Sequence, residues 1–446
     1  MADSSILDIK EKYSEGDAIK SYEFNEYLPT SGSNLNIPGT ITIHIESQDE
    51  FYHPRRSCLL IEGDLLKDDD GRWDAENIAL ANNGIMHLFS NARYELVGSE
   101  MESVNDPGIA GVMMGIAKNT YEYALGVGMK SCWAPETADT VFAERAFARR
   151  KEYIITKSEP KGSFSFIVEM EDIFGFHEDY DKVTYGMRHK LTLVRKGDDD
   201  AIYKDAAVNI KGKVVLSKIA LLMPRVLPSD IKKFALYKMI ESKVTVDAGY
   251  RMRQCHTAEI PENAQSFDWR LGVRSVTEKP RHVLIAFQTG RAGDQKKKPS
   301  LFDHVNTTQI SVVLNDTKYP SRDVIADFPK HKYVEYYKMF TDFTRNYYHM
   351  DPLTVGNFVD IITYKEEYPI FYIDVEHQSE RMNQGVVDIM LRMRFGKNIP
   401  KGTVAYALVI SDRRIKFQSD GKKDEYIILE GGKCCIRSFD IKKLYR

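Results

Sequence analysis

The chain has 446 residues, 43% of them hydrophobic, so it is long enough for two or three domains with a sizeable core. Its 62 Lys and Arg nearly balance its 65 Asp and Glu, and the net charge of -3 argues against a protein that coats nucleic acid through a strongly basic face. Five scattered cysteines argue against a disulfide framework or a CxxC zinc site, and no apolar signal-peptide region or membrane-spanning run is found.

Alternating apolar and polar residues predict strands along most of the chain. The predicted strands are residues 40–45, 163–170, 190–194, 213–223, 267–273, 282–287, 310–314, 370–376, 388–395, 404–410 and 415–419. Helical patterns are fewer and cover residues 109–126, 230–243 and 331–348. Few helices among many short strands favour a β-sandwich or barrel over alternating βαβ units.

The chain also repeats itself coarsely. Phe164 in FSFIV corresponds to Phe371 in FYIDV, Leu191 corresponds to Leu391, and Leu96 corresponds to Leu314. Each half contains a helix-bearing insertion, at residues 102–161 and 321–367, followed by strands in the same order. The order of the elements predicts two similar β-domains of about 200 residues each, a size that suits an eight-stranded jelly roll with inserted loops.

The run Gly197-Asp198-Asp199-Asp200 raises the question of a metal site, because some polymerases hold magnesium with clustered aspartates. The matching position of the second half carries Lys397, Asn398 and Lys401 instead. Gly, Asp and Asn all tolerate the backbone geometry of tight turns. We therefore interpret the aspartates as a structural turn at the tip of a hairpin.

Two further groups of residues contain side chains that could bind a metal or act in catalysis. His177 and Asp179 fit the His-x-Asp pattern of iron-dependent β-barrel oxygenases, although no third ligand is selected, and a polar loop is the simpler interpretation. Cys255 and His256 are adjacent on a strand, so their side chains point to opposite faces and cannot readily act as nucleophile and base.

Two basic stretches remain. Lys296, Lys297 and Lys298 lie between Gly and Pro and are interpreted as a solvated loop, with contact to a neighbouring subunit or nucleic acid as the alternative. The basic tail, residues 421–446, could pack on the domain, dock a partner or be flexible. No catalytic, cofactor-binding or metal-binding residues are therefore predicted.

Several segments resemble the capsid proteins of Polinton/Maverick-type elements and adintovirus-like DNA viruses in animal genomes. The similarity runs in order over residues 39–420 and is one of extended segments, without a catalytic signature. The segments are HPRRSCLLIEGDL, ALANNGIMHLFSNARYEL, GSFSFIVEMEDIFGFHEDYDKVTYGMRHKLTLVRKGDDDAIY, LMPRVLPSD, YRMRQC, KPRHVLIAFQTG, FDHVNTTQISVVLNDTKYP, FYIDVEHQSER and YALVISDRRIKFQSDG.

This resemblance implies an all-β fold with inserted helices, built from two tandem eight-stranded jelly-roll β-sandwiches. The expected division is an N-terminal arm (1–38), a first jelly roll (39–228), a connecting helix (229–243), a second jelly roll (244–420) and a basic tail (421–446). Three copies would form a pseudo-hexagonal capsomer, and capsomers would tile an icosahedral shell. The inserted helices and loops would build subunit contacts or a short outward tower.

The expected function is that of a major capsid protein without enzyme activity or cofactor. Its partners would be further copies of itself and the penton and minor capsid proteins, without sequence-specific binding of nucleic acid; contact with a membrane is left open. It would be made in the host cytoplasm or nucleus, without a signal peptide, and reside in the virion capsid. The alternatives are a metal-dependent enzyme on two jelly rolls, and a β-sandwich module that binds carbohydrate or protein.

Overall fold

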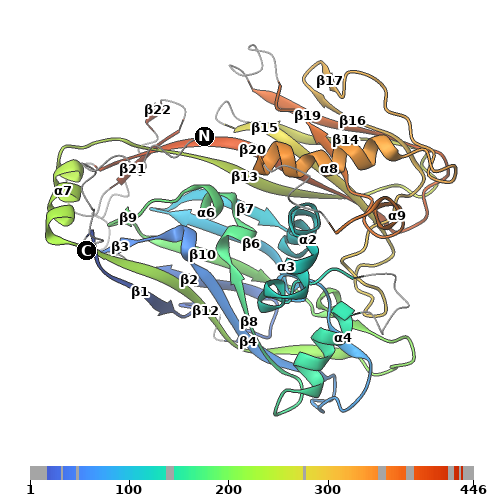
Figure 1. The fold of residues 1–446 in the computed structure, drawn as a ribbon, viewed down its shortest axis with the longest axis horizontal. Helices are drawn as coiled ribbons and strands as arrows, with labels where there is room; N and C mark the ends of the chain where they lie inside the picture. The colour runs from blue at the N-terminus through green and yellow to red at the C-terminus, as the bar shows by residue number, and fades with distance from the viewer. Residues whose placement is uncertain are drawn as a thin grey trace, which may run out of the picture.

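The structure is a computed structural model that describes residues 18–31, 34–46, 50–136, 145–274, 278–349, 358–377, 386–419, 426–430 and 433–434. Its strands form two similar sets of antiparallel sheets, one in each half of the chain. In Figure 1 the first half, in blue and green, lies below the second half, in yellow and orange, and helix α7 (Asp230–Glu241) joins them at one end.

The first half is a sandwich of two sheets. One sheet has the order β1–β12–β4–β8 and is extended by β3 and β9, and the other has the order β2–β10–β6–β7. Its strands are β1 (Ile19–Tyr27), β2 (Gly39–Ile45), β3 (Phe51–Tyr52), β4 (Cys58–Lys67), β5 (Ile78–Leu80), β6 (Phe89–Leu96), β7 (Ser99–Asn105), β8 (Ser163–Glu169), β9 (Thr184–Tyr185), β10 (His189–Arg195), β11 (Ile202–Lys204) and β12 (Gly212–Pro228). Its helices are α1 (Gly84–His87), α2 (Pro107–Lys118), α3 (Tyr121–Leu125), α4 (Arg145–Lys151), α5 (Met170–Ile173) and α6 (Gly175–Asp179).

The second half repeats this plan. One sheet has the order β13–β20–β15–β18, with β21 and β22 added beyond β20, and the other has the order β14–β19–β16–β17. Its strands are β13 (Val246–Glu259), β14 (Ser266–Arg274), β15 (Glu278–Thr289), β16 (Thr307–Leu314), β17 (Thr317–Tyr319), β18 (Phe371–Asp374), β19 (Val387–Phe395), β20 (Thr403–Ser419), β21 (Tyr426–Glu430) and β22 (Lys433–Cys434). Its helices are α8 (Val334–Tyr348) and α9 (Ile361–Glu366).

The strand orders of the two halves match position for position. Eight strands of each half correspond when the short strands β3, β5, β9 and β11 and the added β21 and β22 are left out. Counted in chain order, strands one, eight, three and six then form one sheet, and strands two, seven, four and five form the other, which is the jelly-roll arrangement. The predicted correspondences fall on equivalent strands: β8 with β18, β10 with β19, and β6 with β16. Both helical insertions lie between the fifth and sixth strands. The predicted double jelly-roll fold is therefore confirmed.

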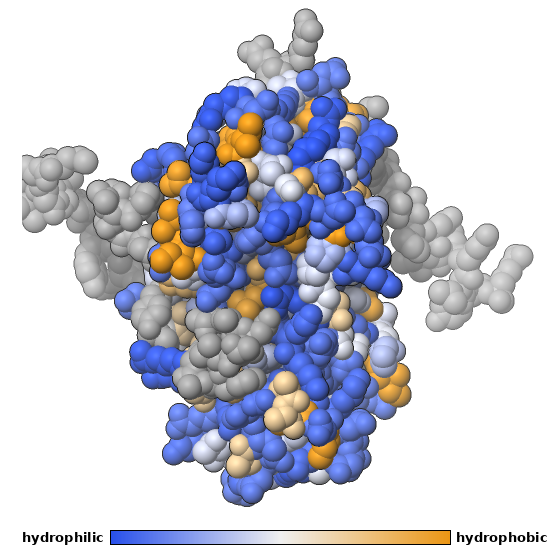
Figure 2. All heavy atoms as spheres, turned by 90° about the vertical axis from the view of Figure 1, so that its right-hand side faces the viewer, coloured by the Kyte–Doolittle hydropathy of each residue, from blue (hydrophilic) through white to orange (hydrophobic). Residues whose placement is uncertain are grey.

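The alternation that predicted the strands reflects two-layer packing. In β19, residues Val387, Ile389, Leu391, Met393 and Phe395 are buried in the core, while the residues between them are more exposed. Each such side chain contributes roughly 1.5–3 kcal/mol by leaving water. At the end of the molecule opposite α7, the surface is mostly hydrophilic with scattered apolar side chains (Figure 2).

Two element predictions differ from the structure. The strands predicted at 404–410 and 415–419 are one strand, β20, because Ser411, Asp412 and Arg413 stay extended while paired with β13. The helix predicted at 109–126 is two helices, α2 and α3. Within α2, Gly115 lets the helix pack closely against Trp133, because a Cβ at this position would lie 2.4 Å from the indole nitrogen.

Candidate functional site

The richest polar site lies where the two halves meet, a region we name the junction. Strand β13 of the second half crosses β7 and α6 of the first half. The Tyr250 hydroxyl donates to the Met101 carbonyl at 2.7 Å, and the Thr257 hydroxyl donates to the Asp106 carboxylate at 2.9 Å. These side chains come from positions about 150 residues apart in sequence, so the junction depends on the whole fold.

Arg251 of β13 binds Asp179 of α6 through both carboxylate oxygens. Its Nε donates to Oδ2 at 2.9 Å and its Nη2 to Oδ1 at 2.5 Å, while its backbone N–H also reaches Oδ2 at 2.8 Å. The remaining Nη1 donates to the Tyr347 carbonyl at 2.6 Å, and the guanidinium lies 3.9 Å from the centre of the Tyr347 ring. A bidentate pair with a cation–π contact fixes the orientation of the two halves as well as their contact.

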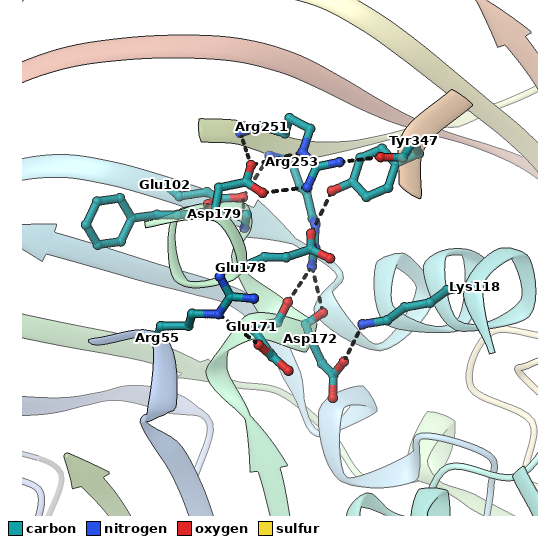
Figure 3. A network of polar contacts seen from close by, with 12 residues as sticks. Arg55, Glu102, Lys118, Glu171, Asp172, Glu178, Asp179, Arg251, Arg253 and Tyr347 are labelled. Carbon is teal, nitrogen blue, oxygen red and sulfur yellow. Dashed lines mark hydrogen bonds and ion pairs between the residues drawn. The ribbon is translucent and has the colours of Figure 1, made fainter. Parts of the chain in front are cut away.

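Arg253, also on β13, is buried and pairs with the buried Glu178 of α6. Its Nη1 donates to the carbonyls of Glu171 and Asp172 at 3.1 and 3.0 Å, and Glu178 also accepts from the Tyr347 hydroxyl at 2.7 Å. Figure 3 shows Arg253 in the middle of this network. Burial acts to raise the pKa of Glu178, but Arg253 and its other partners outweigh burial and lower it to about 2.

Glu102 of β7 is the third buried charge of the junction. Its carboxylate accepts from the backbone N–H groups of Gly175, Phe176 and Arg253 at 3.1, 3.0 and 2.7 Å. Burial raises the pKa of Glu102 to about 7, against the opposite effects of Arg253 and of the backbone donors. The same carboxylate thus holds the start of α6 and the middle of β13 together.

A second contact joins the halves through the loop that follows β15. The Gln295 amide donates to Asp199 at 2.8 Å and to the Gly212 carbonyl at 2.7 Å, and it accepts from the Gly212 N–H at 2.9 Å. The backbone N–H of Gly293 donates to Asp200 at 2.7 Å. Asp199 and Asp200 of the aspartate run therefore bind the second half of the chain.

The aspartate run is a structural turn, but it is not a hairpin tip. Strand β10 before it pairs with β2 and β6, whereas β11 after it pairs with β5, so the chain crosses between sheets at this point. Asp198 binds Arg195 and accepts from the Val214 N–H at 2.9 Å. The hairpin interpretation is wrong because alternation alone does not show which strand is the hydrogen-bonding partner.

The helical insertions provide a third contact. Thr344 of α8 donates to the Ala117 carbonyl of α2 at 3.0 Å. Below them, Ser300 of the second half donates to Glu136 at 2.5 Å, and the same carboxylate pairs with Arg150, which is fully buried. A buried pair left without one partner is costly, so these contacts tie the insertions to both halves.

His177, Glu178 and Asp179 do not form the predicted polar loop. They lie in the short helix α6 at the junction, where Glu178 and Asp179 bind arginines. His177 is fully buried, neither ring nitrogen has a hydrogen-bond partner, and its ring centre lies 4.3 Å from that of Tyr94. His177 and Asp179 therefore have separate surroundings and do not converge as metal ligands.

The remaining residues named in the sequence analysis lie in strands, a loop and the tail. On β13, Cys255 is buried while His256 is half-buried, as expected for adjacent strand residues, and burial raises the pKa of the Cys255 thiol. The solvated-loop interpretation holds for the exposed Lys296 but is wrong for Lys298, which is buried with its Nζ 5.0 Å from the Tyr203 ring centre. The tail lies outside the described residues apart from β21 and β22, and β21 pairs with β20.

Within the described part of the chain, no three His, Cys, Asp or Glu side chains are grouped as a metal site requires. Every helix among the described residues is too short or too polar to span a lipid bilayer. The junction residues were missed from sequence because Glu102, Glu178 and Arg253 are ordinary charged residues in alternating segments. The one available signal was the pair of arginines at positions 251 and 253, two residues apart and thus on one face of a strand.

Residues 138–415, more than half of the chain, match the family described as double jelly roll-like domain. No curated protein shows significant sequence similarity to the chain. The Faustovirus major capsid protein is similar in structure, with a TM-score of 0.55 at 7% identity over 91% of each chain. A chain of the Sputnik virophage gives 0.53 at 10% identity over 93% of this chain and 89% of that one. The mavirus major capsid protein gives 0.50 at 11% identity, over 92% and 90%. At these identities the likeness shows a shared fold.

Proposed function

The chain belongs to the double jelly roll-like family, and from that premise we propose that it is a structural major capsid protein. The observation that carries the proposal is the repetition of one eight-strand order in two halves that are joined by a partly buried charged junction. Proteins with this fold include the major capsid proteins of Faustovirus and mavirus. A rigid two-unit block is suited to tiling, because each copy presents two similar units at a fixed angle.

In this proposal three copies form a pseudo-hexagonal capsomer, and capsomers tile an icosahedral DNA-virus-like shell. The sequence segments that resemble Polinton/Maverick-type and adintovirus-like capsid proteins favour that group as its relatives. Penton and minor capsid proteins would complete the shell, and sequence-specific binding of nucleic acid is not part of the role. The protein would be made in the host cytoplasm or nucleus and incorporated into the virion.

We propose further that the protein acts without catalysis or a cofactor. The functional units would be the jelly rolls at residues 39–228 and 244–420, joined by the helix within 229–243, with an arm before and a basic tail after them. Strand β1, which lies inside the proposed arm, also pairs with β12 and so contributes to the first sheet. The buried charges would then serve to hold the two units in one orientation.

The solution mass by light scattering after size exclusion tests this function. One chain has a mass of 51.2 kDa, so a trimer gives 3 × 51.2 = 153.6 kDa. A species near that mass would support the capsomer and justify electron microscopy of assembled shells. A monomer at every concentration would contradict a preassembled capsomer.

A further inference from the structure

The junction is a head-to-tail contact between unlike edges of two like units. The first unit contributes its fifth strand, β7, together with α6, and the second unit contributes its first strand, β13. Among the described residues, the corresponding edges pair with no further strand: the outer edge of β1, the first strand of the first unit, and that of β17, the fifth strand of the second unit. Head-to-tail contacts can be repeated and can close into a ring.

The free edge at β1 carries exposed apolar side chains. Strand β1 pairs with β12 along one side, and within the described residues no strand pairs with its other edge. Phe24 is 55% exposed and Leu28, directly after the strand, is 56% exposed. On the equivalent strand β13, by contrast, Met252 and Cys255 are buried. An exposed apolar edge strand is a surface that another chain can cover.

The second free edge begins at β17. The equivalent residues of the first unit, Met101, Glu102 and Val104 on β7, are buried, and Glu102 accepts a hydrogen bond from β13. After β17 the chain runs on the surface, where Ile325 is 73% exposed. Residues 317–325 thus present an apolar side chain at the position where the first unit holds its neighbour.

The two free edges differ in their own charge, but most of these charges are already paired within the chain: Lys20 with Asp230, Glu26 with Lys218, Lys318 with Asp323, and Arg322 with Glu335. Residues 19–28 carry one lysine and two glutamates, a net charge of 1 − 2 = −1. Residues 317–325 carry one lysine, one arginine and one aspartate, a net charge of 2 − 1 = +1. A contact between the two edges therefore depends on their exposed apolar side chains more than on charge.

We propose that β1 of one copy docks on residues 317–325 of a second copy, repeating between chains the contact that β13 makes with β7 within one chain. The partner is a second copy because the intrachain junction already shows how such edges fit, and both edges are present in every chain. This inference rests on the proposed capsid function and names the surface through which its copies meet. Tyr22, Phe24 and Leu28 become the apolar centre of the contact.

A double substitution tests the β1 side of the contact. Phe24→Asp with Leu28→Asp changes two side chains that are exposed in the single chain, so the unit should fold with an unchanged circular dichroism spectrum. The mass by light scattering should fall threefold, from 153.6 kDa to the 51.2 kDa of one chain. The matched control is Val127→Asp, a residue that is 58% exposed and follows α3 in the insertion before β8, the strand at the opposite edge of that sheet from β1; it should remain a trimer.

A cross-link tests the pairing of the two edges directly. Leu28→Cys with Ile325→Cys, in a background of Cys434→Ser and Cys435→Ser, should give covalent dimers and trimers with a short thiol-reactive linker. Val127→Cys with Ile325→Cys, in the same background, is the control and should stay monomeric on a denaturing gel. A wild-type trimer that survives the β1 substitutions and does not cross-link overturns this surface alone. A monomeric wild type overturns both this surface and the proposed function.

Discussion

Gly175 sets how closely α6 approaches β13. A Cβ at this position would lie 1.7 Å from the Arg251 carbonyl oxygen, a backbone atom that cannot turn aside. Gly175→Ala must therefore push α6 away and weaken the bonds of Glu102 and Asp179, and we expect a loss of about 2 kcal/mol or more in the free energy of unfolding. Chemical denaturation measures it. Gly249→Ala on β13, where a Cβ meets open space, is the control and should change stability by less than about 0.5 kcal/mol.

His177 should make the fold sensitive to acid. Burial, with the nearby His189 and Arg253, lowers its pKa from 6.5 to about 3. Between these values the unfolded chain binds the proton and the folded chain does not, so stability falls as the pH drops below 6.5. Lowering the pH from 6.5 to 5 should cost about 2 kcal/mol through this residue.

The variant His177→Phe isolates that effect, since Tyr94, Phe174 and Phe176 already surround the ring with aromatic side chains. Denaturation at pH 7 and pH 5 should show a smaller acid loss for the variant than for the wild type. Glu102 acts in the opposite direction, because its raised pKa of about 7 makes its contribution grow as the pH falls toward 4.5. It is present in both proteins and cancels. Equal acid losses in the two proteins would contradict the role of His177.

At the scale of elements, the loop after β15 should stabilise the turn after β10 through its hydrogen bonds. Gln295→Ala removes three hydrogen bonds and leaves the backbone groups of Gly212 without these partners. We expect a loss of about 2–3 kcal/mol and faster amide exchange over residues 198–212. Lys296→Ala, at the exposed neighbouring position, is the control. Unchanged exchange in Gln295→Ala would show that the loop does not hold the turn.

Among the elements, the positions of the strands could be predicted from the sequence, whereas their pairing partners could not. Alternation located the strands because each has one buried face, and β8, β10 and β6 were matched correctly with β18, β19 and β16. Strand partners were not predictable: β10 and β11 read as a hairpin because periodicity carries no information on pairing. The strands predicted at 404–410 and 415–419 are one strand, because β13 pairs along the whole stretch and keeps the residues between them extended.

The junction could not be predicted from the sequence either, because its partners are distant in the chain. Arg253 and Glu178 are charged residues, which by composition belong on a surface, and only the assembled fold buries them as a pair. His177 follows an apolar run and precedes two acids, so a polar loop was the natural expectation, whereas tertiary packing turned the segment into a buried helix. The pairing partners lie 75 residues apart in the chain, beyond any local pattern.

At the scale of the whole molecule, the junction should couple the two units into one unfolding transition. Arg251 and Arg253 are two charges that the second unit places against the first, and removing them leaves Asp179 and the buried Glu178 without their positively charged partners. An uncompensated buried charge costs about 3–5 kcal/mol, while each sandwich keeps its own core. The double variant Arg251→Met with Arg253→Met should therefore show two transitions in scanning calorimetry where the wild type shows one.

The control for this prediction is a matched pair of arginines within one unit. Arg270 and Arg394 pair with Asp388 and Asp268 between neighbouring strands of the second unit, and both ion pairs are substantially exposed. Exposed pairs contribute about 0–1 kcal/mol, so Arg270→Met with Arg394→Met should keep a single transition at nearly the same temperature. One transition in the junction variant would mean that other contacts between the units, such as that of α2 with α8, couple them without the buried charges. Two transitions in the wild type would mean that the units unfold independently and would contradict the prediction.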